Sequence, residues 1–362
     1  MHFLIKGSEL VASVAMVEKA ISTNSQTPVL EGLHLSVDDQ DLTITANNLQ
    51  MAIQTRTACN VFKIGEHIVN GRLFSELVRK LPAEDVTMEW NDGRILISSG
   101  TMEFSLNTIT GEDFPPYPSC TEHVLDLTDY ELLRLIRSSS FAASNDDHQP
   151  IFSGVLMELK DKKINFVATD SNRLAFVQAE TGTSYIPEGS FVIPKVNLVE
   201  LGRCLPMNET LVEVFSGSNQ LAFRFDNTIF TTRLIDGRFP NYMSVLYTEQ
   251  KTTFRMKRTQ LIQAVERAAI VGRIDSAPVL LQVTDGVLEI ETTSKLGKSQ
   301  EQYNVQHDGP SEQAAYSPKF MLDMIKTMDG AEVEFRFEGS RQALIKAADN
   351  ENHLYILMPI RI

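Results

Sequence analysis

Glu76-Leu77-Val78-Arg79 returns twice further along the chain, as Glu200-Leu201-Gly202-Arg203 and as Asp323-Met324-Ile325-Lys326. Each copy has an acid, an apolar residue directly after it and a base three positions after the acid. On a helix, residues three apart share one face, so each copy predicts a helix whose acid and base are neighbours. The copies lie about 120 residues apart, and self-similarity at a fixed interval is the mark of a repeated structural unit.

Three further signals recur in the same order around this pattern. An apolar-periodic helix precedes it in each third, at 8–17, 130–136 and 260–265. A proline then opens a strand at Pro28, Pro150 and Pro278, where the missing N–H removes no ladder bond. A polar turn and a second strand complete a predicted hairpin, with second strands at 42–45, 164–167 and 288–291.

Two more strands follow the second helix of each third. They are predicted at 86–90 with 94–98, at 211–215 with 221–225, and at 333–337 with 343–347. The chain is therefore predicted to be α+β, with three similar domains at 1–120, 121–248 and 249–362. The boundaries fall in two turn-rich or polar linkers, around 115–119 and 247–251.

Composition is that of an ordinary globular protein, with 43% hydrophobic and 22% charged residues in a chain of 362. The net charge of −14 excludes a strongly basic nucleic-acid coat. The three cysteines, Cys59, Cys120 and Cys204, lie far apart, which argues against a disulfide framework or a Cys-x-x-Cys zinc or redox pair. With no signal-peptide core and no run of 18 apolar residues, we expect a soluble cytoplasmic protein.

The positive charge is concentrated in the predicted helices. Bases outnumber acids in these six segments, at 8–22, 70–81, 128–142, 194–205, 257–273 and 316–328, although the whole chain is acidic. Helix propensity does not explain this, because glutamate favours helices as much as lysine does. A helix-lined surface would therefore be positive and suited to phosphates. In the absence of helix-turn-helix, zinc-finger or ribonucleoprotein motifs, such binding would be independent of sequence.

Two other classes of protein remain as alternatives. An enzyme of this size is common, but the chain has no phosphate-binding loop, dinucleotide fingerprint, nucleophile elbow or His-Glu-x-x-His motif, so we expect no catalytic site, metal or cofactor. Paired carboxylates at Asp38-Asp39 and Asp146-Asp147 are better explained as polar turns. A scaffold that binds only proteins would keep the repeats but would not need basic helices.

Three stretches give the chain a family resemblance: 167–175 (Val-Ala-Thr-Asp-Ser-Asn-Arg-Leu-Ala), 234–242 (Leu-Ile-Asp-Gly-Arg-Phe-Pro-Asn-Tyr) and 355–362 (Tyr-Ile-Leu-Met-Pro-Ile-Arg-Ile). With them the chain resembles, from end to end, the bacterial sliding clamps, the beta subunits of replicative DNA polymerase. The resemblance implies three similar domains with helices on one face and antiparallel sheets on the other, and a head-to-tail homodimer that closes into a ring. It also implies a non-catalytic processivity factor that encircles double-stranded DNA and tethers the replicative polymerase. Clamp-loader and repair proteins would bind through short peptide motifs.

The resemblance also assigns residues to three sites. A partner-peptide cleft between domains 2 and 3 would use Phe152, Thr169, Ser171, Asn172, Arg173, Leu174, Pro240, Val245, Phe320, Ile356, Met358, Pro359, Ile360 and Arg361. The DNA-facing candidates are Arg72, Arg79, Lys80, Arg137, Lys195, Arg203, Lys319 and Lys326. The dimer contact would use Phe104 and Leu106 of domain 1 with Ile270 and Val271 of domain 3.

This sequence departs from the family pattern at several of these places. Asn172 stands where relatives often carry histidine. Residues 101–103 stand where relatives can be basic, and 294–302 is less acidic than expected of a partner edge held by ion pairs. The loop 145–149 carries two acids and is not assigned to DNA. The dimer is therefore expected to depend on apolar contacts.

Overall fold

The computed structural model describes residues 1–23, 26–110, 113–146, 148–180, 188–246, 249–273 and 276–361. The expected boundary at residue 248 and Asp147 of the loop 145–149 lie outside the described residues. Contacts within the chain group into two compact units. Unit 1 comprises Met1–Tyr130 and Glu200–Leu234, and unit 2 comprises Glu131–Val199 and Ile235–Ile362. The second third of the sequence is thus shared between the two units.

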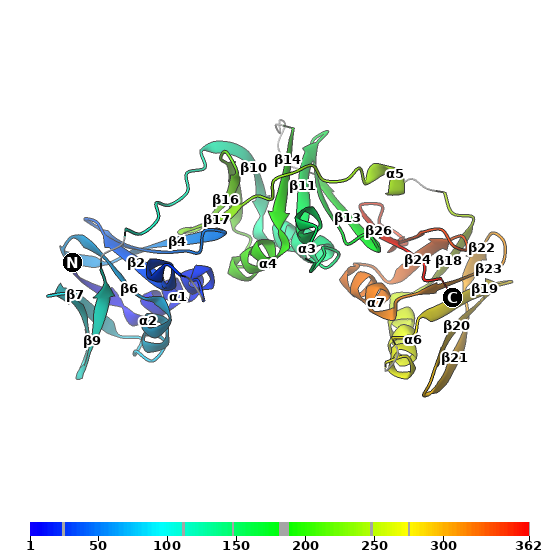
Figure 1. The fold of residues 1–362 in the computed structure, drawn as a ribbon, viewed down its shortest axis with the longest axis horizontal. Helices are drawn as coiled ribbons and strands as arrows, with labels where there is room; N and C mark the ends of the chain where they lie inside the picture. The colour runs from blue at the N-terminus through cyan, green and yellow to red at the C-terminus, as the bar shows by residue number, and fades with distance from the viewer. Residues whose placement is uncertain are drawn as a thin grey trace. The chain divides into compact units, whose positions relative to one another are not determined.

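The same order of elements occurs three times along the chain: a strand, a helix, a group of strands, a second helix and three strands (Figure 1). The first third contains β1 (His2–Lys6), α1 (Gly7–Val17), β2 (Gly32–Val37), β3 (Asp41–Asn47), β4 (Met51–Ala58), β5 (Asn60–Lys63), β6 (Gly65–Asn70), α2 (Gly71–Val78), β7 (Asp85–Asn91), β8 (Arg94–Ser99) and β9 (Met102–Ile109). The second contains β10 (Glu122–Thr128), α3 (Asp129–Ser140), β11 (Gly154–Lys160), β12 (Lys163–Thr169), β13 (Arg173–Glu180), β14 (Gly189–Pro194), α4 (Lys195–Cys204), β15 (Leu211–Ser216), β16 (Gln220–Phe225) and β17 (Thr228–Arg233). The third, after the short α5 (Met243–Leu246), contains β18 (Thr252–Lys257), α6 (Arg258–Val271), β19 (Val279–Thr284), β20 (Val287–Ser294), β21 (Gly297–Asn304), β22 (Gln306–Asp308), β23 (Glu312–Tyr316), α7 (Pro318–Thr327), β24 (Glu332–Phe337), β25 (Ala343–Ala347) and β26 (His353–Leu357).

The predicted helices and hairpins are confirmed in all three thirds. The hairpins β2–β3, β11–β12 and β19–β20 are antiparallel, as are the later pairs β7–β8, β15–β16 and β24–β25. The helices that carry the recurring acid and base begin at Gly71, Lys195 and Pro318. The fold is therefore α+β with three similar domains.

The prediction that a proline opens a strand is wrong in two of the three copies. Pro28 and Pro150 each begin a 3-10 turn, Pro28–Glu31 and Pro150–Ser153, and the strand starts at the glycine that follows. Proline suits the first position of a helical turn because its φ is fixed and its missing N–H would have no partner there. In the third copy, Pro278 directly precedes β19, as predicted.

Unit 1 contains one sheet of thirteen strands, in the order β10-β15-β16-β17-β4-β3-β2-β6-β9-β8-β7-β1-β5. Helices α1 and α2 pack against each other, and α1 also packs on β3 and β4 (Figure 1). Leu10, Val14 and Val17 recur on one face of α1 and are buried there. This spacing explains why the segment forms a helix that covers a sheet.

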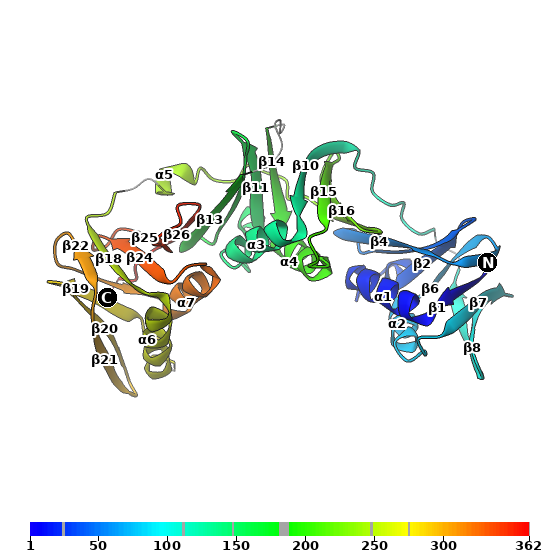
Figure 2. The same cartoon turned by 180° about the vertical axis from the view of Figure 1, so that it is seen from behind.

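Unit 2 contains a nine-stranded sheet, β14-β11-β12-β13-β26-β25-β24-β18-β22, and a four-stranded sheet, β21-β20-β19-β23. Helices α6 and α7 pack side by side, and α6 contacts β18 to β21 (Figure 2). Leu261, Ala264, Val265 and Ala268 supply its buried face. No helix among the described residues is long and apolar enough to cross a membrane.

Strand pairing also joins neighbouring thirds within each unit. In unit 1, β17 pairs with β4 from Thr228↔Thr55 to Thr232↔Met51, and we call this pairing the first seam. In unit 2, β26 pairs with β13 from Val177↔His353 to Arg173↔Leu357, and this is the second seam. Each seam joins the last strand of one third to the third strand of the preceding hairpin group.

Candidate functional site

A cavity of about 200 Å³ lies beside the second seam, entirely within unit 2. It is lined by residues of β12, β13, β26, the turn before β11 and the linker that precedes β18: Phe152, Thr169, Ser171, Arg173, Leu174, Phe239, Pro240, Asn241, Tyr242, Val245, Ile356 and Met358. Most of this lining is apolar, with hydroxyl, amide and guanidinium groups among it. Such a mixture suits a ligand with apolar anchors and a few polar contacts.

The turn between β12 and β13 forms one wall of the cavity. The Asp170 carboxylate accepts hydrogen bonds from the backbone N–H of Asn172 and of Arg173, each at 3.0 Å. The Thr169 hydroxyl donates to the Arg173 carbonyl at 2.7 Å. Ser171 adopts φ +72°, in the left-handed region that non-glycine residues seldom occupy. These bonds fix the turn before any ligand arrives.

Arg173 holds several elements of this site together. Its side chain is only 6% exposed, and its Nε donates to Asp170 at 2.9 Å. One terminal nitrogen donates to Asp323 of α7 at 2.6 Å, and the other donates to the Phe141 carbonyl at the end of α3 at 2.7 Å. The guanidinium also lies over the Phe320 ring, 4.3 Å from its centroid. Because all three nitrogens are engaged within the chain, Arg173 positions the cavity wall.

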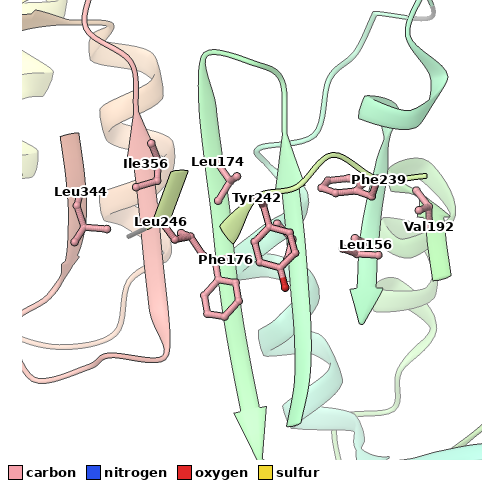
Figure 3. Packing of buried hydrophobic residues seen from close by; sticks show 10 residues of the cluster. Leu156, Leu174, Phe176, Val192, Phe239, Tyr242, Leu246, Leu344 and Ile356 are labelled. Carbon is pink, nitrogen blue, oxygen red and sulfur yellow. The ribbon is translucent and has the colours of Figure 1, made fainter. Parts of the chain in front are cut away.

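The linker between the second and third domains covers an apolar cluster next to the cavity (Figure 3). Phe239, Tyr242 and Leu246 of the linker pack there with residues from both sides of the second seam. The other buried members are Leu156, Val167, Leu174, Phe176, Val192, Leu344 and Ile356. The linker is therefore a structural part of the cavity wall and not a loose connection.

The structure brings together most of the predicted cleft residues, but not all of them. Phe152, Thr169, Ser171, Arg173, Leu174, Pro240, Val245, Ile356 and Met358 line the cavity, whereas Asn172, Phe320, Pro359, Ile360 and Arg361 do not. Phe320 contacts Arg173 instead. The backbone N–H of Ile360 donates to the Ala315 carbonyl at 2.7 Å, which directs the end of the chain toward β23.

Three lining residues were missed by the sequence reasoning: Phe239, Asn241 and Tyr242. They belong to a stretch that the resemblance singled out, in which only Pro240 was assigned to the cleft. The available signal was the pattern Phe-Pro-x-Tyr, which occurs both at 114–117 and at 239–242, in the two linkers.

The predicted dimer residues lie on or beside strand edges that are open in the described part of the chain. Residues 102–107 of β9 pair with β8 only, and β21 pairs with β20 only. Phe104 on β9 is 36% exposed and Leu106 is half-buried. Ile270 at the end of α6, beside β21, is 69% exposed and Val271 is half-buried. Exposed apolar side chains on open strand edges are the features of a pairing surface, not of an internal core.

The DNA-facing candidates lie on or next to helices, and most are exposed. Four form ion pairs with acids: Arg72 with Glu76, Arg79 with Glu18, Arg203 with Glu200, and Lys326 with Glu266. Lys80, Arg137 and Lys319 are exposed and have no ion pair among the described residues. Exposed pairs of this kind are worth little free energy, so the paired bases can exchange an acid for a phosphate at low cost.

Lys195 differs from the other candidates because it is half-buried at the start of α4. Its amine donates to the Ala143 carbonyl at 3.1 Å and to the Asn145 side chain at 3.0 Å. Burial, followed by the nearby charge of Arg173, lowers the pKa of Lys195. Its first role is therefore to hold the segment that follows α3.

Comparison with known proteins covers the chain from end to end. Residues 1–118, 126–241 and 243–361 match the N-terminal, central and C-terminal domains of the DNA polymerase III beta subunit. The beta sliding clamp of Bacillus subtilis is 30% identical over 376 residues, and that of Vibrio cholerae is 29% identical over 368, each covering all of both chains.

Solved structures give the same result. The Bacillus subtilis DNA polymerase sliding clamp has a TM-score of 0.97 at 30% identity, covering 100% of this chain and 99% of that one. A Pseudomonas aeruginosa sliding clamp solved bound to griselimycin has a TM-score of 0.93 at 26% identity, with both chains fully covered. On these matches and the threefold repeat, the chain belongs to the DNA polymerase III beta-subunit family, the beta sliding clamps.

Proposed function

We propose that two copies of this chain join head to tail into a ring around duplex DNA, and that partner proteins dock in the cavity beside the second seam. The family consists of non-catalytic processivity factors, and this chain is a DNA sliding clamp that serves the replicative polymerase. Its partners are double-stranded DNA, the polymerase, the clamp loader and repair proteins. Replication of a bacterial chromosome takes place in the cytoplasm, and we place the protein there.

The strand pairing of the repeats is the observation that carries the ring. In both seams the last strand of one third pairs with the third strand of the preceding group, β17 with β4 and β26 with β13. The same rule leaves β9 and β21 as the two strands still open for such a partner. Since these edges of β9 and β21 do not pair with each other within the described chain, the rule would be completed by β9 of one copy against β21 of another. Such a contact is heterologous, and it closes when the rotation between copies permits.

DNA binding is proposed to use the exposed bases of the helices without reading sequence. Lys80, Arg137 and Lys319 offer cations that no acid holds among the described residues. Arg72, Arg79, Arg203 and Lys326 would contribute by exchanging their acids for phosphates. Contacts of this kind are individually weak and depend on salt, which permits sliding, because encirclement keeps the clamp on the duplex.

Partner docking is proposed for the cavity beside the second seam, whose lining includes the buried Leu174 and Ile356, the half-buried Val245 and the exposed Met358 and Pro240. A leucine or phenylalanine anchor would bury apolar area there, and flexible methionine adapts to different side chains. We also propose domain limits at 1–120, 121–248 and 249–362, which the three matched regions of the family support.

The ring is tested by the mass of the protein and by two edge variants. Wild type should sediment at about twice 40.5 kDa. Phe104→Arg and Ile270→Arg should each be monomeric. In a dimer of identical variant chains, every contact between β9 and β21 would contain the substituted residue. An equimolar mixture should form a heterodimer, because the intact β21 edge of the first variant meets the intact β9 edge of the second.

A monomeric wild type at micromolar concentration would refute the ring. Failure of the mixture to associate would refute the head-to-tail arrangement, provided that each variant retains the circular dichroism spectrum of the wild type. The cavity is tested separately with griselimycin: binding should be lost in Met358→Asp and kept in Phe104→Arg. Equal binding by both variants would refute the assignment of the cavity.

A further inference from the structure

A second cavity, of about 220 Å³, lies in unit 1 beside the linker that follows β9. Two stacked ring pairs form much of its wall. His67 of β6 stacks on Trp90 of β7, with ring centroids 4.6 Å apart and planes 5° apart. His34 of β2 stacks on Phe114 of the linker at 5.2 Å and 18°.

Two carboxylates complete this aromatic cavity. Glu66 lies with Oε2 3.3 Å from His34 Nε2, and its side chain is 71% exposed. Asp113 also lines the cavity and is exposed. Burial lowers the pKa of His34 and of His67, so both rings are neutral at neutral pH. The described lining therefore carries two negative charges and no positive one.

The repeat makes this combination distinctive, because the matching positions in the second domain have different chemistry. His34 pairs with Ile68 across β2 and β6, and Leu156 pairs with Val192 in the same register across β11 and β14. His34 thus corresponds to Leu156, and Glu66 and His67 correspond to Ser190 and Phe191. At these three positions the first domain has two histidines and an acid, where the second has leucine, serine and phenylalanine.

Flat aromatic walls with carboxylates at the rim favour a planar cation. A cation over ring faces gains about 0.5 to 2 kcal/mol, and a guanidinium also stacks on rings and binds a carboxylate through two parallel hydrogen bonds. We propose that this cavity binds an arginine side chain of a partner protein, as a second contact distinct from the cavity at the second seam.

Other ligands fit the cavity less well. A nucleobase would stack on the same rings, but its phosphate would meet Glu66 and Asp113 in an acidic protein. A metal ion is disfavoured because the described residues contain no group of three or more histidine, cysteine or acidic side chains that could hold one. An ammonium group lacks the flat face that the stacked rings offer.

The test uses the single tryptophan of the chain, Trp90, whose fluorescence reports on this cavity alone. The full-length protein is titrated with the blocked tripeptide acetyl-Ala-Arg-Ala-amide and with the same peptide carrying citrulline, which is isosteric and neutral. The arginine peptide should give a saturable change in emission, and the citrulline peptide should bind at least about tenfold more weakly.

Three variants make the result specific. Glu66→Gln should weaken arginine-peptide binding by about tenfold. Glu89→Gln removes an exposed acid next to Trp90 in sequence but on the opposite face of β7, and should leave binding unchanged. Met358→Asp, which tests the cavity at the second seam, should also leave it unchanged. Equal binding of citrulline, an unchanged affinity in Glu66→Gln, or a saturable response to oligothymidylate in place of the peptide would overturn the proposal.

Discussion

The two linkers between domains share the pattern Phe-Pro-x-Tyr but close their seams differently. In the first, the Tyr117 hydroxyl lies 2.8 Å from the Ile229 carbonyl and 2.9 Å from the Thr231 hydroxyl, so it bonds directly to the strands of the first seam. In the second, the Tyr242 ring is buried with Phe176 and Phe239, and its hydroxyl bonds to the Glu158 carboxylate.

This difference shows how one repeated module gives one seam closed by polar contacts and one seam with a cavity beside it. The first linker inserts a polar group that satisfies the backbone of its seam. The aromatic side chains of the second linker pack in an apolar cluster, and Pro240 and Met358 remain exposed in the lining of a cavity. Met358 is 40% exposed, so apolar surface remains uncovered beside this seam.

The largest expected effect concerns the arginine of the second seam. Arg173→Ala leaves Asp170 and Asp323 without their partner in a largely buried site and should lower the free energy of unfolding by about 3 to 5 kcal/mol. Arg56→Ala, next to the first seam, removes exposed pairs with Asp38 and Asp41 and should cost at most about 1 kcal/mol. Urea denaturation measures both, and equal losses would contradict the contrast.

The same arginine variant should also bind griselimycin more weakly while the dimer persists. Arg173 shapes the cavity wall and lies on neither open edge, so sedimentation should still give twice the chain mass. Unchanged affinity would show that the wall keeps its form without the guanidinium.

A smaller effect is expected for the two linker phenylalanines. Phe239→Ala removes a buried ring from the apolar cluster and should cost about 3 kcal/mol. Phe114→Ala removes a half-buried ring and should cost roughly half as much. Thermal denaturation of both variants compares the two losses of stability. A larger loss in Phe114→Ala would show that packing of the first linker contributes more to stability than packing of the second.

Acid should weaken the second seam through His353, which is buried on β26 with neither ring nitrogen hydrogen-bonded among the described residues. Burial and the charge of Arg134 lower its pKa below the ordinary 6.5, against an opposing effect of Asp329. The unfolded chain therefore takes up a proton first as the pH falls below 6.5. Stability is lost from there down to the folded-state pKa, by at most about 1.4 kcal/mol per pH unit.

The control for this pH effect is His353→Leu. In this variant the free energy of unfolding should fall less steeply between pH 6.5 and 5.5, because the contribution of His353 is absent. The residues paired in the first seam, 51–55 and 228–232, include no histidine or acid, so no such contribution is expected there. His34 and His67 titrate in unit 1 in both proteins and cancel in the comparison. An identical slope in the variant would exclude His353 as the cause.

The smallest change is expected from Tyr117→Phe, which deletes one hydroxyl. Loss of its bonds to the first seam should cost about 1 kcal/mol in urea denaturation. Griselimycin affinity should not change, because the cavity lies at the other seam. A change in affinity would mean that the two joints are coupled.

Much of the fold could be predicted from the sequence because local patterns of apolar and polar residues indicate its helices and hairpins. The spacing of Leu10, Val14 and Val17 defines a helix face, and the hairpins have apolar strands around polar turns. The start of β2 and β11 could not be placed, since a proline suits a strand start and a 3-10 turn equally well. The pairing of β17 with β4 joins residues far apart in sequence and has no local signal.

The residues that line the cavity at the second seam could be brought together only through resemblance to a family. No local pattern indicates that Thr169, Pro240 and Met358 line one cavity, because three separate elements bring them together. The engagement of Arg173 with Asp323 was equally hidden. The sequence alone does not show whether an arginine binds a ligand or pairs with an acid of the same chain, as Arg173 does with Asp323.

The division of the central domain between two units has a consequence for how the chain comes apart. The piece of sequence that recurs is not the piece held in one sheet, because β10 and β15 to β17 share a sheet with the first domain while β11 to β14 share one with the third. We expect the units that unfold cooperatively to follow the sheets and not the repeats. Hydrogen exchange should therefore show amides of β15 to β17 protected like those of β4, and amides of β13 protected like those of β26. The sequence repeats define the domain boundaries. Hydrogen bonding between strands of neighbouring domains is expected to define the boundaries of the units that unfold together.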